Sequence, residues 1–139
     1  MYEYSRHVYY YETDKMGVVH HSNYVRWLEE ARTFYFNDMD LAYVETERLG
    51  LMCPITDIDL KFKYPARYGD RFTVRLKMIK YTGVRFRMTY TIINQEGAIL
   101  LEGESGHAFI DSSYKPVSLS RTIPQRHELM KALFIEGMQ

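Results

Sequence analysis

The chain has a single cysteine, Cys53, among its 139 residues. An intrachain disulfide is therefore impossible, and a reducing compartment such as the cytoplasm is expected. No apolar run approaches the roughly 20 residues that a membrane-spanning helix needs, and the first residues enter patterned sequence without the apolar core of a signal peptide. Net charge is absent as well, because 18 basic residues balance 18 acidic ones. That balance argues against a dedicated nucleic-acid protein, which draws its phosphate affinity from a basic excess.

Aromatic residues are abundant by contrast, at 15% of the chain, with 13 tyrosines. Tyrosine buries a large ring and keeps a polar hydroxyl, so it suits sheet faces, interfaces and pocket rims equally. The excess therefore decides no function by itself. The length fits one domain spanning residues 1–139, which can bury enough surface to fold without disulfides or structural metal ions.

The hydrophobic pattern predicts one long helix and a run of strands. From Asn23 onward, apolar residues recur at helical spacing as far as Tyr35, with Ser22 or Asn23 as the N-cap and Asn37-Asp38 at the end. A second short helix or turn is expected within 39–49, closed by Gly50, and another helix over 124–133. The strands are predicted where apolar and polar residues alternate: 2–11, 58–64, 71–80, 84–93 and about 98–110.

Short links between the later strands require antiparallel pairing. One aromatic helix and one antiparallel meander must cover each other to bury both apolar faces, so the fold class is α+β. Trp27, Leu28, Phe34 and Tyr35 are expected in the core.

The densest chemical pattern lies between Glu12 and Tyr24, which read ETDKMGVVHHSNY and run into the helix VRWLEEAR. It places the carboxylate of Asp14, a turn at Gly17 and a histidine at 21 directly before a helix start. The first backbone N–H groups of a helix are unpaired, and they can hold an oxyanion. A carboxylate facing such donors is the arrangement that acyl transfer needs.

This string closely resembles the acid–turn–histidine–helix signature of hotdog-fold acyl-CoA thioesterases, in the 4-hydroxybenzoyl-CoA thioesterase-like group. The resemblance covers nearly the whole chain. It implies a curved antiparallel sheet wrapped around one long central helix. It also implies hydrolysis of an acyl-CoA thioester to free acid and CoA, without a metal or redox cofactor.

By the same resemblance Asp14 is the catalytic carboxylate, acting either as nucleophile or as general base. The backbone N–H of His21 would point at the thioester oxygen, and Gly17 would allow the tight reversal that orients the loop. The active unit would be a homodimer or homotetramer. Met52 and Cys53, in the segment Met52-Cys53-Pro54, would then approach the partner's site and contact its substrate.

Several alternatives stay open at this stage. Asp14 can equally be a turn-capping aspartate. Tyr24 either lines the acyl pocket or packs in the core. Glu29 is a second candidate carboxylate on the helix, but an ion pair with Arg26 or Arg32 is the preferred explanation for it.

Other polar residues carry weaker hypotheses. Adjacent histidines, His20 and His21, cannot readily hold one metal ion, and no metal-binding spacing is present. Cross-strand pairing explains Glu102 and Glu104. Cys53, without a histidine at motif spacing, is expected to be a small hydrophobe. The phosphates of CoA would suit a basic group on the sheet, which comprises Lys61, Lys63, Lys80, Arg85 and Arg87.

Two rival functions accompany the acyl-CoA hypothesis. The first is a thioesterase acting on acyl carrier protein. The second is a non-catalytic acyl-CoA-binding module, which would have no need for a carboxylate beside the thioester.

Overall fold

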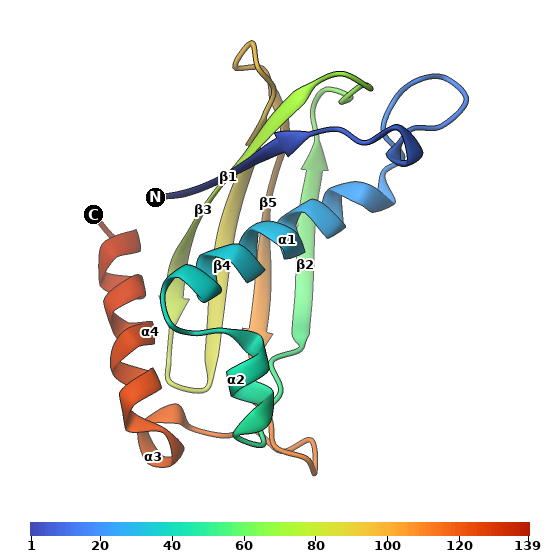
Figure 1. Ribbon diagram of the computed structural model, residues 1–139. Coiled ribbons are helices and arrows are strands. Elements are labelled where there is room, and N and C mark those ends of the chain that lie inside the picture. The colour runs from blue at the N-terminus through green and yellow to red at the C-terminus, as the bar shows by residue number, and fades with distance from the viewer.

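The computed structural model describes residues 1–139. One five-stranded antiparallel sheet has the strand order β1-β3-β4-β5-β2 (Figure 1). The strands are β1 (Tyr2–His7), β2 (Ile55–Phe62), β3 (Arg71–Tyr81), β4 (Arg85–Ile93) and β5 (Ile99–Ala108). The α+β fold class is confirmed.

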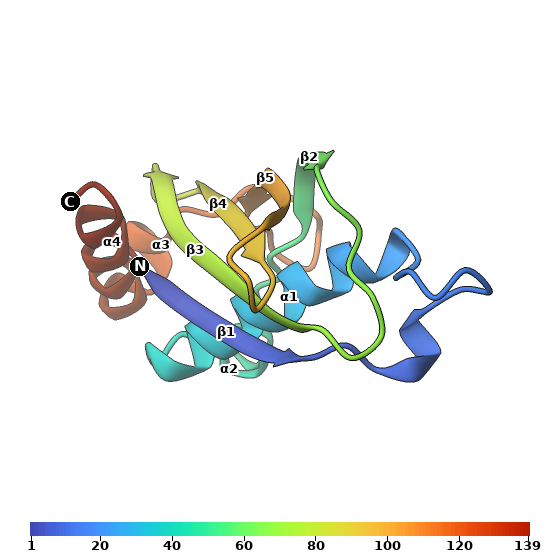
Figure 2. The ribbon, with the colours of Figure 1, turned by 90° about the horizontal axis from the view of Figure 1, so that it is seen from above.

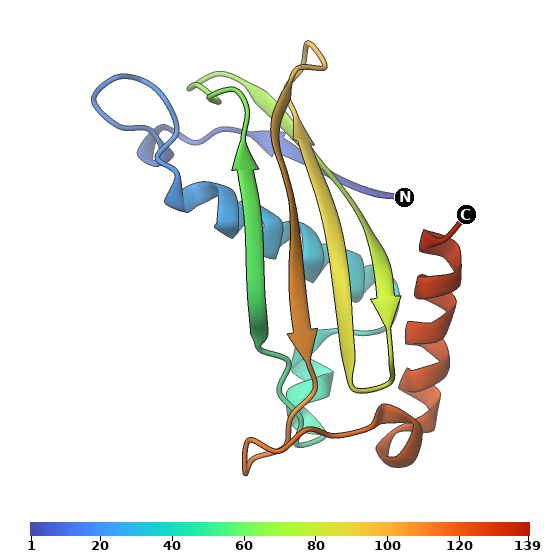
Figure 3. The same cartoon turned by 180° about the vertical axis from the view of Figure 1, so that it is seen from behind.

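The long helix α1 (Ser22–Asp38) crosses the inner face of the sheet, and the strands curl around it when seen from above (Figure 2). The short helix α2 (Tyr43–Arg48) follows it, and α3 (Leu119–Thr122) leads into α4 (Pro124–Gly137). Seen from behind, α4 stands beside β3, at the side of the sheet away from β2 (Figure 3). The sheet wrapped around a central helix is therefore confirmed.

A cluster of 25 buried residues fills the space between α1 and the sheet. Trp27 is fully buried and stacks on Phe72 of β3, with ring centroids 3.8 Å apart. Truncating a buried aromatic of this kind costs about 3–5 kcal/mol, so the contact fixes how α1 sits on the sheet. No helix is long and apolar enough to cross a membrane.

Several predicted boundaries are wrong. The first strand stops at His7 instead of residue 11, because Tyr10–Glu12 form a short 3-10 helix. Strand β2 begins at Ile55, three residues before the predicted start, because it pairs along β5. Helix α1 has neither Ser22 nor Asn23 as its N-cap. His21 holds that position, and its side chain makes no capping bond.

Two packing predictions are also wrong. Phe34 is half exposed and stacks on Tyr4, outside the core. The alternation of tyrosine and charged positions along 71–80 and 84–93 predicts an outer face able to pair two sheets. Tyr90 instead points into the core, and Tyr81 bonds to His127 of α4.

Strand β2 lies at the edge of the sheet, and its apolar residues are open to solvent. Ile58 is 41% exposed and Phe62 is 53% exposed. Phe62 contacts Tyr24 of α1, so this apolar side faces the helix layer. A free edge with uncovered apolar residues is a surface that native proteins pair or cover.

Candidate active site

The loop between β1 and α1 is anchored by Glu12, a buried carboxylate. Arg6 donates two hydrogen bonds to this carboxylate, of 3.0 and 2.7 Å. Trp27 donates its indole N–H to the same carboxylate at 2.8 Å, and the Tyr9 amide donates at 2.8 Å. Arg6 also pairs with Glu30 of α1, at 2.8 Å. This ion-pair cluster ties the end of β1 to the middle of α1.

The backbone of Glu12 holds the far end of the same loop. Its carbonyl accepts bonds from the His20 amide and from the Asn23 side chain, each 2.9 Å long. Thr13 and Val19 form an isolated bridge that closes the loop at its base. The loop of residues 14–18 therefore extends from a hydrogen-bonded base beside the start of α1 (Figure 1).

Replacing Glu12 with glutamine should destabilise the fold by about 1–3 kcal/mol, because buried hydrogen bonds from Arg6, Trp27 and Tyr9 lose their charged acceptor while Glu30 still pairs with Arg6. Burial by itself would raise the pKa of the Glu12 carboxyl, but hydrogen bonds from Arg6, Trp27 and Tyr9 hold that pKa below its usual 4.5. The bound carboxylate thus stabilises the fold at pH values above 4.5, and this contribution is lost as pH falls through the lower folded pKa.

Urea unfolding at pH 7 and at pH 4 measures both effects. Glu3→Gln is the control, because it makes the same change in an exposed pair with Arg75. That control should change stability by less than about 1 kcal/mol. Equal losses in the two variants would contradict the anchoring role of Glu12.

Asp14 sits in the exposed part of the loop. Its carboxylate Oδ1 accepts a 2.9 Å bond from the Met16 amide, and the Gly17 amide donates to its carbonyl at 3.0 Å. Gly17 has φ +76°, a conformation that favours glycine, so the predicted tight reversal is present. One carboxylate oxygen thus orders the turn, while Oδ2 makes no hydrogen bond in the chain. Asp14 also lines an open depression with Tyr10, Tyr11, Thr13 and Lys15.

The start of α1 offers one free backbone donor. The amides of Ser22, Asn23 and Tyr24 donate to His20 or His21. The amide of His21 donates to no acceptor within the chain, and the positive end of the helix dipole lies at this position. The Gly17 amide, in contrast, is used inside the turn. The backbone N–H of His21 is therefore a free hydrogen-bond donor where the loop meets α1.

Tyr24 makes the contacts of a core residue. It is 4% exposed, its ring meets Trp27 and Phe62, and its hydroxyl accepts a 3.0 Å bond from the Ala66 amide. It forms the buried wall directly behind the loop.

Met52 and Cys53 lie away from Asp14 in the same chain, just before the start of β2. Met52 is partly exposed, and Cys53 packs beside Tyr43. Burial raises the pKa of the Cys53 thiol to about 12, which keeps it protonated at neutral pH. That protonation state disfavours cysteine nucleophile chemistry.

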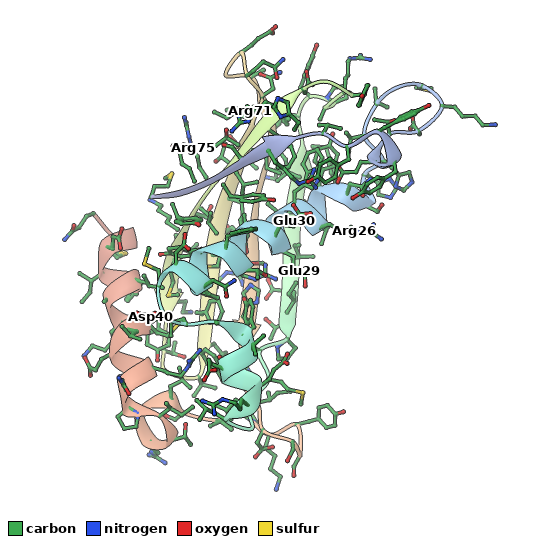
Figure 4. All side chains as sticks on the ribbon, viewed as in Figure 1. Arg26, Glu29, Glu30, Asp40, Arg71 and Arg75 are labelled. Atoms are coloured by element: carbon green, nitrogen blue, oxygen red, sulfur yellow. The ribbon has the colours of Figure 1, made fainter.

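Glu29 and Glu30 point to different sides of α1 (Figure 4). Glu30 meets Arg6, whereas Glu29 is exposed and has no ion-pair partner within 4.0 Å. The expected pairing of Glu29 with Arg26 or Arg32 is therefore wrong. The rings of His20 and His21 lie in a tilted arrangement with centroids 4.2 Å apart, and no group of three metal-ligating side chains gathers around them.

Of the basic group on the sheet, Arg87 is already paired with Asp57 and Glu104. The contact with Glu104 is the cross-strand pairing expected for that glutamate. Lys61, Lys63, Lys80 and Arg85 form no ion pair.

The chain was compared with known proteins. The model of the family described as the thioesterase-like superfamily matches residues 8–133. The chain belongs to this thioesterase family. A Bacillus subtilis protein with the provisional name acyl-CoA thioesterase YneP is 34% identical over 119 residues, which are 85% of this chain and 86% of that protein. The acyl-CoA thioester hydrolase YbgC of Escherichia coli is 30% identical over 122 residues, covering 84% of this chain and 87% of YbgC.

A solved structure gives the same result for the fold. The DHNA-CoA thioesterase of Staphylococcus aureus superposes with a TM-score of 0.89 at 32% identity. The match covers 98% of this chain and 94% of that enzyme. The hotdog fold implied by the sequence is therefore confirmed.

Two of the buried charges, Glu12 and Arg32, have no functional role predicted from the sequence. A signal existed for Glu12, because its partner Arg6 lies on the same side of β1 as Tyr4, in line with the buried Val8 just after the strand. A signal also existed for Arg32, which follows Tyr24 and Leu28 on the buried stripe of α1.

Proposed function

We propose that this chain is an acyl-CoA thioesterase in which Asp14 is the catalytic carboxylate. The observation that carries the proposal is the free His21 amide at the start of α1, beside a loop that presents an exposed carboxylate. The thioester oxygen accepts a hydrogen bond from that amide, which stabilises negative charge as the carbonyl carbon is attacked. Family membership and the named functions of the relatives support the reaction class.

Two routes use Asp14. In the first, its carboxylate attacks the thioester carbon, expels CoA as the thiolate and forms a mixed anhydride that water then cleaves. In the second, it takes a proton from a water molecule that attacks the same carbon. Both routes yield the free acid and CoA, and both need the unbonded Oδ2 of Asp14. Gly17 supports them by holding the turn that orients the carboxylate.

The proposed active unit is a homodimer built on the free edge of β2, and two such dimers could form a tetramer. In an antiparallel β2–β2 pair, the start of one strand lies beside the end of the other. Phe62, at the end of β2, contacts Tyr24 at the start of α1. Met52 and Cys53 precede the start of β2. The pairing therefore brings Met52 and Cys53 of one chain beside the helix start of its partner, with Tyr24 as the wall behind.

A panel of acyl-CoA substrates, assayed by thiol release with the purified chain, tests the proposed function. We expect saturable hydrolysis of at least one member, with kcat/KM of about 10⁴ M⁻¹s⁻¹ or more. Acylated carrier protein is included with the same acyl group. A preference for it over every acyl-CoA would favour the carrier-protein function. Binding of acyl-CoA without thiol release would favour a non-catalytic module and contradict the proposal.

A further inference from the structure

A second hollow of about 230 Å³ lies between α1, α2 and the segment before β2. Its lining includes Arg32, Tyr43 and Cys53, with Glu29 and Glu47 at exposed positions. Arg32 is only 5% exposed, so its charged head group lies inside the protein. The proposed chemistry at Asp14 makes no use of this arginine.

The guanidinium of Arg32 has neutral partners only. Its Nε donates to the Tyr43 hydroxyl at 2.9 Å, and its Nη1 donates to the Tyr90 hydroxyl at 3.1 Å. Burial raises the pKa of Tyr43, so this hydroxyl carries no negative charge near neutral pH. Nη2 makes no hydrogen bond, and no carboxylate approaches within 4.0 Å. A largely buried cation without a counter-charge is costly, so an anion that enters the hollow would relieve this cost.

The side chain is held in position before any anion arrives. The Tyr90 hydroxyl that accepts from Arg32 also bonds to Ser105 at 2.6 Å, and Ser105 bonds to His107 at 2.7 Å. This polar chain fixes one edge of the guanidinium against the sheet. The unbonded Nη2 belongs to a residue that lines the hollow, and its N–H groups, which lie in the guanidinium plane, are donors that suit a carboxylate oxygen.

We propose that this hollow binds a carboxylate at the far end of the acyl group, so that dicarboxylic acyl-CoA molecules are the preferred substrate class. The inference rests on the proposed function and on the β2-paired dimer. Cys53, which that dimer brings to the partner's helix start, lines the same hollow as Arg32. The acyl group would thus extend from Asp14 of one chain toward Arg32 of its partner. Glu29 and Glu47 at the rim are exposed to water, whose high dielectric constant weakens their repulsion of a bound carboxylate.

The test compares adipoyl-CoA with hexanoyl-CoA, which have equal carbon chains and differ only in the terminal group. We expect the wild-type protein to favour adipoyl-CoA in kcat/KM by about tenfold or more, the effect of one charge-assisted hydrogen bond. Arg32→Met should remove the preference, with most of the loss in kcat/KM falling on adipoyl-CoA. Arg48→Met is the control, because Arg48 is an exposed arginine of α2 paired with Glu45. It should keep the preference.

A binding measurement separates this inference from the proposed function. Calorimetry with free adipate and free hexanoate reports the site without any turnover. Arg32-dependent binding of adipate in a protein that hydrolyses no acyl-CoA would refute the proposed function and leave the site standing. The inference would be overturned if the wild-type protein hydrolysed adipoyl-CoA and hexanoyl-CoA at equal rates and bound adipate and hexanoate equally. A preference for adipoyl-CoA that survives in Arg32→Met would also overturn it. If Arg32→Met fails to fold, Tyr43→Phe, which removes one hydroxyl that orients Arg32, should reduce the preference measurably.

Discussion

Replacing Asp14 with asparagine should lower kcat by about 10²–10⁴-fold, with a larger loss if Asp14 is the nucleophile. Asparagine keeps the side-chain oxygen that accepts the Met16 amide, so the turn should survive. It loses the negative charge, and with it the ability to take a proton or attack a thioester. Asp14 is exposed, so the change should hardly affect stability. Turnover on the best acyl-CoA and circular dichroism measure the two effects.

Asp70→Asn is the matched control for this prediction. Asp70 also orders a turn, through a 2.9 Å bond from the Arg67 amide. If Asp14 only capped its turn, the two substitutions would have similarly small effects on kcat. A near wild-type rate in Asp14→Asn would therefore move the chemistry to another group.

A charge on the free edge of β2 should separate the subunits and abolish activity. Ile58→Lys places a solvated charge in the uncovered apolar side of the edge strand, a device that native edge strands use to prevent pairing. Light scattering at micromolar concentration should report at least a dimer for the wild-type protein and a mass near 16.6 kDa for the variant. The rate of thiol release should also drop in Ile58→Lys, because each active site then lacks Met52 and Cys53 of its partner.

Ile99→Lys is the control, since Ile99 is 42% exposed and lies on β5, away from the free edge. It should remain a dimer with full activity. A wild-type protein that is monomeric and fully active would refute the shared site. Mixing Asp14→Asn subunits with Met52→Arg subunits adds a further check. Random exchange should restore about a quarter of the sites, because half of the dimers are then hybrids with one intact site.

The sequence predicts the fold well because its periodicity reports which face of each element is buried. Trp27 and Leu28 repeat at helical spacing and are buried, and Phe72, Val74 and Leu76 alternate and are buried. The start of β2 is not predictable in the same way, since residues 55–57 extend the strand only by pairing with β5. Phe34 follows the helical period but is half exposed, because it packs on Tyr4 of the edge strand β1.

The candidate site is predictable in part. The order of Asp14, Gly17 and His21 indicates a turn before a helix, and the positive φ of Gly17 agrees with that reading. Which amide stays free depends on partners that the order alone does not show. The Gly17 amide donates to the Asp14 carbonyl, and the Ser22 amide donates to the His20 ring. The Arg6–Glu12 pair and the lack of a counter-charge at Arg32 follow from tertiary packing. The sequence pattern shows only that these residues are charged and occupy inward-facing positions.

The central claim is that Asp14 supplies the carboxylate, and the most direct test compares Asp14→Asn with Glu29→Gln. Glu29 is an exposed carboxylate of α1 that has no ion-pair partner and lines a hollow of this chain. Both variants are assayed by thiol release on the same acyl-CoA at saturating concentration. We expect kcat to fall by about 100-fold or more in Asp14→Asn and to stay within a few-fold of wild type in Glu29→Gln. The reverse order, with Glu29→Gln inactive and Asp14→Asn active, would contradict the account.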